Sequence, residues 1–243
     1  MPNYNIEHHQ IIESALDNFN ADFFCQNSII FGGGTRIALE LDEFRESIDI
    51  DFLCPNKASY RAVRQEVTNI ELGKLVKEEF EYIREIRADR DAVRTAIKVA
   101  NSAIKLEFVS FDDYELTYEF NPEKFPVPVL SQESCFYTKL LANADRMLIS
   151  PYKDIFDILA MYKAWGSIPE KAITLAEGHY GEKTVVPSLI TALKDMLKSP
   201  ENYIKAAANV KMNPDWIDDI IHHQPSKLLK EMEQFLAARA GKA

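Results

Sequence analysis

The chain has 243 residues, of which 47% are hydrophobic and 27% are charged, and its formal net charge is −10. This composition is typical of a soluble globular protein and excludes a disordered chain, and the length suits one large domain or two small ones. The acidic balance argues against a broad, non-specific nucleic-acid surface, although it leaves room for a local basic groove.

No apolar run reaches the ~18 residues that a bilayer span needs, and the first residues lack the basic and apolar regions of a signal peptide. We therefore expect a cytoplasmic protein with no membrane partner. Cys25, Cys54 and Cys135 are far apart, which predicts buried thiols and not a disulfide framework or a zinc site. The pairs His8-His9 and His222-His223 are predicted to be surface residues, because neighbours on a helix do not share a face.

The first part of the chain predicts a strand that leads through glycines into a helix. Apolar residues at helical spacing predict a helix over 6–20, and the run at 28–31 predicts a short buried strand. Three glycines follow at 32–34, and a short helix is predicted over 35–41. Glycines before a helix let backbone N–H groups approach an anion, and Thr35 can cap the helix and reach a phosphate.

Two aspartates lie in the next predicted strand, over 48–53. Asp49 and Asp51 are separated by one residue, so they project from the same face, about 7 Å apart, and can share hard cations. A phosphate cradle followed by a carboxylate pair points to phosphoryl or nucleotidyl transfer. A Walker A loop ends in Gly-Lys-Ser or Gly-Lys-Thr. Here the glycines lead into Thr35 and Arg36, so the segment is not a Walker A loop.

The middle of the chain predicts further strands. A helix capped by Ser59 is expected up to about residue 72, and strands are expected over 79–86, 94–100 and 103–110, the last two joined as a hairpin. In the third of these strands Lys105 and Glu107 share one face. The basic residues between 84 and 98 are interspersed with acidic ones, which favours a solvated surface over a dedicated RNA groove.

Prolines at 122, 126 and 128 break any helix and predict an extended connector. We place the domain boundary there, with one domain over 1–125 and a helical domain over 126–243. Lys139 and Arg146 lie two turns apart on one face of the first helix of this second domain. Ser150-Pro151 is read as the N-cap and first residue of the next helix, which carries Asp154 and Asp157. Further helices are predicted at about 170–177, 186–197, 201–208, 215–220 and 227–238.

The first motif resembles a known family. Gly33-Gly34-Thr35 followed by Asp49-x-Asp51 looks like the first motif of DNA polymerase β-like nucleotidyltransferases, and the intervening Arg45 and Ser47 are similar to the AbiEii-type nucleotidyltransferase toxins. That family has Lys-x-Asp where this chain reads Lys105-Leu106-Glu107, so the third carboxylate is longer here.

The helical part also resembles this family. The family pattern Lys-Leu-x-Ala-x-x-x-Arg matches the residues from Lys139 to Arg146, and Arg-Asp-x-x-Asp matches the residues from Lys153 to Asp157. Lys153 replaces the arginine, which keeps the charge and loses the fork geometry. The resemblance covers roughly residues 29–162.

The resemblance implies an α/β (α+β) nucleotidyltransferase domain with a small mixed sheet, followed by a helical domain that closes over an NTP held in the cleft. Two Mg²⁺ ions are expected on Asp49 and Asp51, one of them shared with Glu107. The remaining expected roles are phosphate binding and assistance to the site. Gly33, Gly34 and Thr35 are expected to hold phosphates, Arg36 and Lys139 to neutralise their charge, and Asp154 or Asp157 to assist.

The family further implies a toxin neutralised by a cognate antitoxin, with tRNA or another RNA 3′ end as one acceptor. A protein or small-molecule acceptor stays open because the chain is acidic. A module that binds NTP without turnover is also open, because Glu107 departs from the aspartate of the family.

Overall fold

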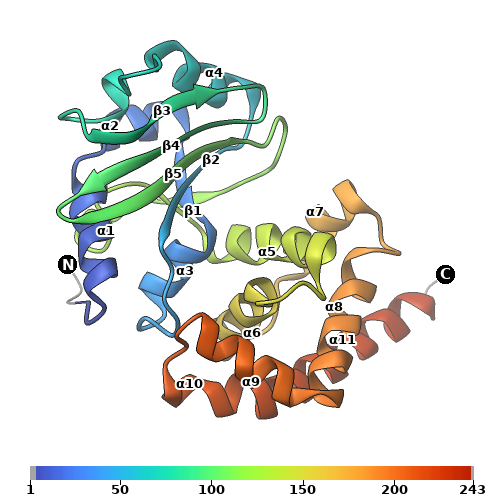
Figure 1. Cartoon of the computed structure of the whole chain (residues 1–243). Helices are drawn as coiled ribbons and strands as arrows, with labels where there is room; N and C mark the ends of the chain where they lie inside the picture. Colours follow the sequence, from blue (N-terminus) through green and yellow to red (C-terminus); the bar gives the residue numbers. More distant parts are fainter. Residues whose placement is uncertain (1–3, 242–243) are drawn as a thin grey trace. The chain divides into compact units, whose positions relative to one another are not determined.

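The computed structural model describes residues 4–241 and divides the chain into two compact units (Figure 1). The sheet unit comprises Met1–Leu39 and Ser47–Ser131, and the helical unit comprises Glu40–Glu46 and Gln132–Ala243. The chain therefore passes into the helical unit at residue 132, a few residues beyond the predicted boundary at 125/126, because the end of the proline-rich connector forms a strand of the sheet. The short segment 40–46, which the sequence did not single out, also belongs to the helical unit.

The sheet unit is built on seven strands in the order β3-β4-β5-β2-β1-β7-β6. Strand β2 runs parallel to β5 and antiparallel to β1, and β1 runs parallel to β7, so the sheet is mixed. The mixed sheet and the helices that follow it confirm the predicted fold class. The strands are β1 (Ile30–Gly32), β2 (Asp49–Cys54), β3 (Glu81–Ala88), β4 (Ala92–Val99), β5 (Ser102–Ser110), β6 (Tyr118–Glu119) and β7 (Val129–Leu130).

Helices α1 and α4 pack against one face of this sheet. Their apolar residues join a buried cluster with the side chains of β2 and β5, including Phe52 and Phe108, whose rings stack at a centroid distance of 5.1 Å. Phe19 and Phe24 pack edge-on against Phe52, each at 4.7 Å, and complete an aromatic centre. The helices of this unit are α1 (Glu7–Asp17), α2 (Ala21–Asn27), α3 (Gly33–Glu40), α4 (Lys57–Glu66) and the 3-10 turn η1 (Gly73–Leu75).

Two helix starts differ from the predictions. Helix α4 is capped by Asn56, whose side chain accepts the backbone N–H groups of Ala58 and Ser59, so Ser59 is not the cap. Helix α6 begins at Lys153 behind Tyr152, which has a left-handed backbone, so Ser150-Pro151 lies before the helix and does not form its N-cap and first turn. Helix α2 has no counterpart among the predicted elements.

The helical unit contains the remaining helices, and segment 40–46 is fixed to it by backbone hydrogen bonds. The Glu46 N–H donates to the Val210 carbonyl at 3.0 Å, and the Asn213 N–H donates to the Phe44 carbonyl at 2.8 Å. None of the helices within residues 4–241 has the length and apolar character that a membrane crossing requires. The helices are α5 (Gln132–Arg146), α6 (Lys153–Trp165), α7 (Glu170–Tyr180), α8 (Val185–Lys198), α9 (Pro200–Asn209), α10 (Pro214–Asp218), the π-helical turn η2 (Asp219–His223) and α11 (Gln224–Ala240).

Candidate active site

Strand β2 presents Asp49 and Asp51 on the face of the sheet opposite to the aromatic core. Ile50 and Phe52 alternate with them and are fully buried, whereas the two aspartates are half-buried. The register places Asp49 beside Lys105 and Asp51 beside Glu107 on the parallel strand β5. The predicted acidic face therefore contains all three carboxylates, and a lysine lies among them.

The glycine turn lies against Asp51. Gly32 is the register partner of Asp51 across β1 and β2, and Gly33 follows with φ +68°, a left-handed conformation that favours glycine. A Cβ on Gly33 would clash with Asp51 Oδ2. Since α3 begins at this glycine, the first backbone N–H groups of a helix lie beside the carboxylate face, and such groups bind anions.

Thr35 fixes the start of β2 from inside the protein. Its side chain is 1% exposed, its hydroxyl donates to the Asp49 carbonyl, and the hydroxyl lies 2.9 Å from Ser47 Oγ. These contacts give Thr35 a positioning role toward Asp49, and its predicted contact with phosphate stays a prediction. The Ser47 N–H donates to Nε2 of His9 at 3.1 Å. The prediction that His9 is a surface residue is wrong, because His9 is fully buried and contacts Ser47 and the ring of Tyr4.

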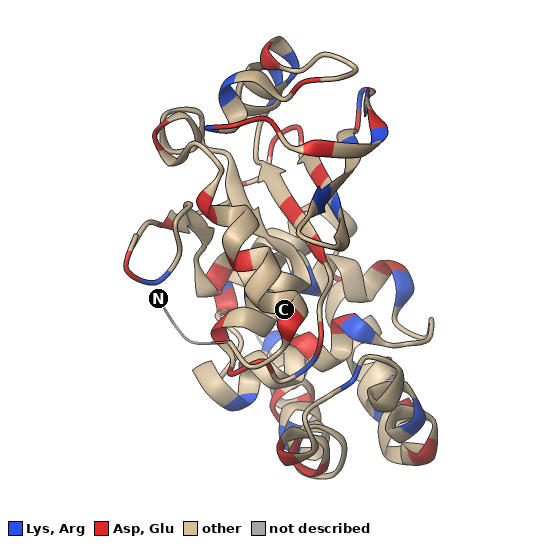
Figure 2. Ribbon diagram, turned by 60° about the vertical axis from the view of Figure 1, so that its left-hand side comes forward, with Lys and Arg blue, Asp and Glu red and all other residues tan. Residues whose placement is uncertain are grey.

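Glu107 is held by two cations. Arg94, its register partner on β4, donates from Nε to Glu107 Oε1 at 2.9 Å, and the Lys105 ammonium lies 2.6 Å from Oε2. Basic and acidic residues thus lie close together on these strands (Figure 2). Arg94 also contacts Asp89 at 2.7 Å, which ties the Glu107 carboxylate to the turn between β3 and β4.

The carboxylate face keeps Lys105 charged. Partial burial alone would lower the pKa of Lys105, but the hydrogen bond to Glu107 and the charges of Glu107, Asp49 and Asp51 outweigh burial and raise the pKa. The Lys105 side chain is therefore a fixed positive charge at neutral pH. It lies beside the pair of aspartates that the sequence singled out.

Asp49 and Asp51 are oxygen donors of the kind that a magnesium ion binds. Magnesium is usually bound through one or two carboxylates together with substrate phosphates, not by a cage of protein ligands. Asp49 and Asp51 fit this requirement, since both are half-buried oxygen donors next to the turn at Gly33. Among residues 4–241 no group of three or more His, Cys, Asp or Glu side chains converges as a metal site. The oxygens of Glu107 contact Arg94 and Lys105, and its predicted share in the metal site stays a prediction.

Arg36 does not lie on an open surface. Its side chain is 1% exposed, its Nε donates to the Leu130 carbonyl at 3.1 Å, and its guanidinium lies 5.8 Å from the centre of the Phe125 ring. These contacts link α3 to β7 and to the end of the connector. The guanidinium is therefore buried, and the predicted role of Arg36 in neutralising phosphate charge stays a prediction.

Lys139, Asp154 and Asp157 form a buried ion-pair network inside the helical unit. The Lys139 ammonium lies 2.9 Å from Asp154 Oδ1 and 2.6 Å from Asp157 Oδ2. Arg45, from segment 40–46, donates to both oxygens of Asp157 at 2.7 and 3.0 Å, and both side chains are at most 1% exposed. Arg146 closes the network with a 2.6 Å contact to Asp154. The sequence named three of these residues as site residues and did not predict that Arg45 joins them.

The charges in this network stabilise one another. Burial alone would raise the pKa of Asp154, but the Lys139 ammonium and the Arg146 guanidinium outweigh burial and hold that pKa well below its usual value. Burial alone would lower the pKa of Lys139, but the Asp157 and Asp154 carboxylates outweigh it and raise that pKa. These contacts explain the burial of the three charged residues without any ligand.

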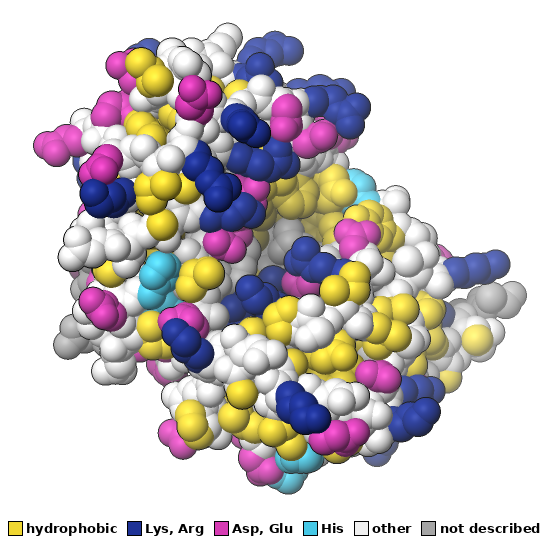
Figure 3. All heavy atoms as spheres, in the orientation of Figure 1, with side chains coloured by type: hydrophobic (Ala, Val, Ile, Leu, Met, Phe, Trp, Pro, Cys, Tyr) yellow, Lys and Arg dark blue, Asp and Glu magenta, His cyan; other side chains and the backbone are white. Residues whose placement is uncertain are grey.

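Basic side chains gather on the same side of the sheet as the carboxylates. Figure 3 shows dark-blue Lys and Arg side chains grouped on the sheet unit. Arg87 is the register partner of Arg94, and Lys98 lies on β4 at the same alternation as Arg94. Lys98 pairs with Glu81 at 3.0 Å, and Arg94 pairs with Asp89 and Glu107. The acidic partners on this face fit the prediction of a solvated surface.

The chain is similar to a known family of proteins along most of its length. A model of the family described as "Nucleotidyl transferase AbiEii toxin, Type IV TA system" matches residues 14–237. The chain belongs to the AbiEii family. Its class of activity is therefore nucleotidyl transfer, and the family predicted from the Gly-Gly-Thr and Asp-x-Asp motifs is confirmed. A search of curated proteins finds no match.

Two solved structures share the fold of this AbiEii family member. A Helicobacter pylori protein, described as a candidate nucleotidyltransferase, is similar with a TM-score of 0.55 and 16% identity, covering 94% of this chain and 96% of that chain. JHP933 from Helicobacter pylori is similar with a TM-score of 0.52 and 17% identity, covering 97% of each chain. At these identities the likeness shows the fold alone.

Proposed function

We propose that this AbiEii family member transfers a nucleoside monophosphate from an NTP to a hydroxyl acceptor, with Mg²⁺ as cofactor. One observation carries the proposal. The glycine turn at Gly33 lies against Asp51 so closely that a Cβ would contact the carboxylate, and Asp49 lies on the same face of the strand. A phosphate-binding turn and a pair of carboxylates are thus adjacent, as nucleotidyl transfer requires.

The residues of this face have separate roles in the proposal. Asp49 and Asp51 hold Mg²⁺, which when bound neutralises phosphate charge and favours loss of pyrophosphate. The backbone N–H groups at the start of α3, from Gly33 and Gly34, donate to phosphate oxygens. Thr35 keeps Asp49 in place through its carbonyl.

The lysine among the carboxylates has an electrostatic role. Lys105 stays protonated and stabilises the negative charge that develops on the phosphates. Glu107 is a positioning residue in this account, because its two oxygens hold Lys105 and Arg94 beside the aspartates.

The reaction is an in-line displacement. The acceptor oxygen forms a bond to the α-phosphorus, the bond from that phosphorus to the bridging oxygen breaks, and pyrophosphate leaves with the electron pair. The proton of the acceptor hydroxyl is released to water. Two ions on Asp49 and Asp51 remain our proposed stoichiometry.

The acceptor and the partner follow from the family. We infer an RNA 3′ end, such as that of tRNA, as the first acceptor to test, and a protein hydroxyl or a small molecule as the alternatives. We also infer a cognate antitoxin, because the family is defined as a toxin of a type IV system.

A second function has one observation in its favour. In an NTP-binding module without turnover, a carboxylate of the site would be withdrawn from catalysis. Glu107 is engaged by Arg94 and Lys105 in this way. The two functions differ in one product, since only a transferase releases pyrophosphate.

The experiment compares label transfer in three proteins. Each α-labelled NTP is incubated with Mg²⁺ and with purified tRNA, a protein extract or neither, and the proteins are the wild type, Asp49→Asn and Asp17→Asn. Asp17 is the matched control, because it is an exposed aspartate at the end of α1. We expect label in an acceptor with the wild type and Asp17→Asn, and none with Asp49→Asn. Equal transfer by Asp49→Asn would refute the proposal.

A further inference from the structure

A cavity lies in the sheet unit, away from the aspartates of β2. Its volume is about 710 Å³, within the range that suits a small-molecule ligand. Ser110 at its edge lies on β5 three residues beyond Glu107, which corresponds to about 10 Å along a strand. The cavity therefore lies outside the proposed transfer site. It is lined by Lys57, Tyr60, Arg61, Arg64, Arg90, Asp91, Ser110 and Asp112.

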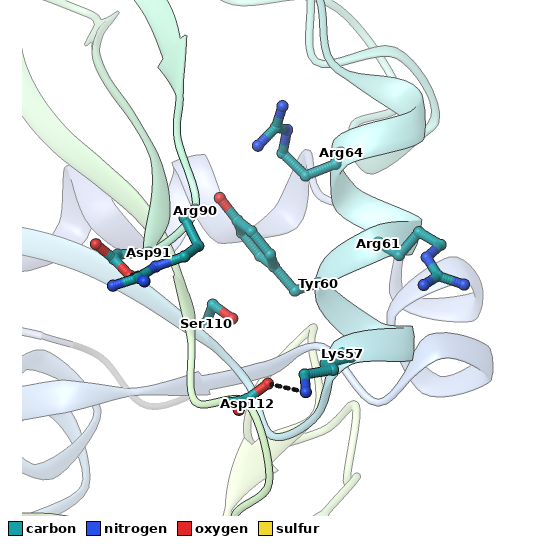
Figure 4. A pocket seen from close by; sticks show the side chains of 8 residues that line it. All are labelled: Lys57, Tyr60, Arg61, Arg64, Arg90, Asp91, Ser110 and Asp112. Carbon is teal, nitrogen blue, oxygen red and sulfur yellow. Dashed lines mark hydrogen bonds and ion pairs between the residues drawn. The ribbon is translucent and has the colours of Figure 1, made fainter.

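Helix α4 supplies half of the lining. Positions 57, 60, 61 and 64 follow helical spacing along α4, and all four residues line the cavity. Figure 4 shows the Tyr60 ring between α4 and the opposite strand, with Arg64 next to its hydroxyl end and Arg61 directed away from the ring. Arg90 and Asp91 come from the turn between β3 and β4, and Asp112 from the segment after β5.

Hydrogen bonds to backbone carbonyls fix the walls of the cavity relative to one another. The Tyr60 hydroxyl donates to the Asp89 carbonyl at 2.7 Å, and Arg64 Nη1 donates to the same carbonyl at 2.6 Å. The Lys57 N–H donates to the Asp112 carbonyl at 3.1 Å. The Ser110 N–H donates to the carbonyl of Asp91 at 2.8 Å. Hydrogen bonds thus join α4 to the turn between β3 and β4 and to the segment after β5, and these segments form the walls of the cavity.

The lining is positive in a chain that is negative. Four basic and two acidic side chains line the cavity, whereas the whole chain has a net charge of −10. Lys57 pairs with Asp112 at 3.2 Å and Arg90 with Asp91 at 3.0 Å, but in both pairs each side chain is at least 66% exposed. Ion pairs exposed to this degree are weak, so an anion of higher charge can compete for Lys57 and Arg90.

We propose that this cavity binds the phosphate and ribose of a ribonucleotide. Arginine and lysine side chains are suited to phosphate, and carboxylates such as Asp91 and Asp112 can accept hydrogen bonds from ribose hydroxyls. An acidic peptide such as decaglutamate carries negative charge but no hydroxyl group that could donate to these two carboxylates. A free nucleotide and the backbone of a polyribonucleotide present this same chemistry, and the two sources are separated below.

The test measures binding by fluorescence anisotropy without divalent cations. The probes are a fluorescein-labelled 12-nucleotide single-stranded RNA, a fluorescent ATP analogue and a fluorescein-labelled decaglutamate peptide. Arg90→Glu is the main variant, because Arg90 is 92% exposed, and circular dichroism verifies that the variant keeps its fold. Arg64→Gln is a second variant. Lys205→Glu, on an exposed position of α9, matches the charge change of Arg90→Glu.

We expect Arg90→Glu to weaken binding of at least one phosphate probe by roughly tenfold relative to Lys205→Glu, the effect of losing one charge-assisted contact. Arg64→Gln should weaken the same probe. Weakening of the RNA alone identifies a polyribonucleotide as the ligand, weakening of the ATP analogue alone identifies a free nucleotide, and weakening of both shows that the cavity accepts either.

Two results would overturn the proposal. One is equal binding of both phosphate probes by Arg90→Glu and Lys205→Glu. The other is tighter binding of the peptide than of either phosphate probe. Asp49→Asn should bind the probe as the wild type does, so loss of transfer in that variant and loss of binding in Arg90→Glu are independent results.

Discussion

Removal of the charge of Asp157 should lower the free energy of unfolding more than removal of a charge on the surface of the helical unit. Asp157 is fully buried and receives two hydrogen bonds from Arg45 and one ion pair from Lys139. Asp157→Asn keeps the size of the side chain and removes its charge. Arg45, whose side chain is 1% exposed, and Lys139, whose side chain is 10% exposed, then lose their shared carboxylate.

The expected loss of stability follows from the burial of these groups. Breaking a buried ion pair by removing one partner costs about 3–5 kcal/mol, because an uncompensated charge stays inside the protein. For a chain of this size each kcal/mol lowers the melting temperature by about 2–4 °C, so we expect a decrease of roughly 6–20 °C. Lys139 retains Asp154, which places the result toward the lower part of that range.

The assay is thermal and urea unfolding followed by circular dichroism, with Asp218→Asn as the control. Asp218 lies in the same unit on α10, and its side chain is 75% exposed. The control should change the free energy of unfolding by less than about 0.5 kcal/mol. A loss below about 1 kcal/mol for Asp157→Asn would refute the reasoning, since it would mean that Arg45 and Lys139 find water or other partners without cost.

Three further predictions concern individual residues and pH. Gly33→Ala should abolish label transfer and cost about 1–2 kcal/mol of stability, because the new Cβ meets Asp51 at a left-handed backbone position. Gly178→Ala should do neither, because a Cβ there meets no atom within 4 Å. The transfer assay measures the first effect and urea unfolding measures the second. Asn143→Leu should raise stability by about 1 kcal/mol in the same unfolding assay, because the buried side-chain amide of Asn143 has no hydrogen-bond partner among the described residues; a loss of stability would contradict this. The pKa of Asp154 in the folded protein is held far below its unfolded value of about 3.8. Its contribution to stability is therefore present above that value and is lost as the pH falls below about 4. Between pH 6 and 2 the free energy of unfolding should decrease less in Asp154→Asn than in the wild type.

Much of the sheet unit could be predicted, because the residue patterns that indicate its strands and turns lie within short stretches of the sequence. The alternation around Asp49 and Asp51 defines both the strand and the face, and the glycines before α3 mark the turn. The short strands β6 and β7 were not predicted, since two-residue strands have no periodicity and form only by pairing with distant partners. Helix α2 is too short to show a helical repeat.

The sequence was less informative about how the charged residues pair. Register across strands brings Arg94 to Glu107, and a pattern within one strand cannot reveal such a pair. Arg45 and His9 are buried by segments distant in sequence, Arg45 by Asp157 and His9 by Ser47. The sequence indicated Arg45 only through its place in the motif that resembles the AbiEii family, and that motif named no partner for it.

The most direct test of the central claim is pyrophosphate release as a function of Mg²⁺ concentration, measured with NTP and the acceptor that takes up label. The wild type and Asp17→Asn should release one pyrophosphate for each nucleotide transferred, and release should cease when Mg²⁺ is removed. Asp51→Asn should keep its fold, verified by circular dichroism, and release none. Release by Asp51→Asn at the rate of the wild type, or release that is independent of Mg²⁺, would contradict the account in which Asp49 and Asp51 hold the metal for transfer.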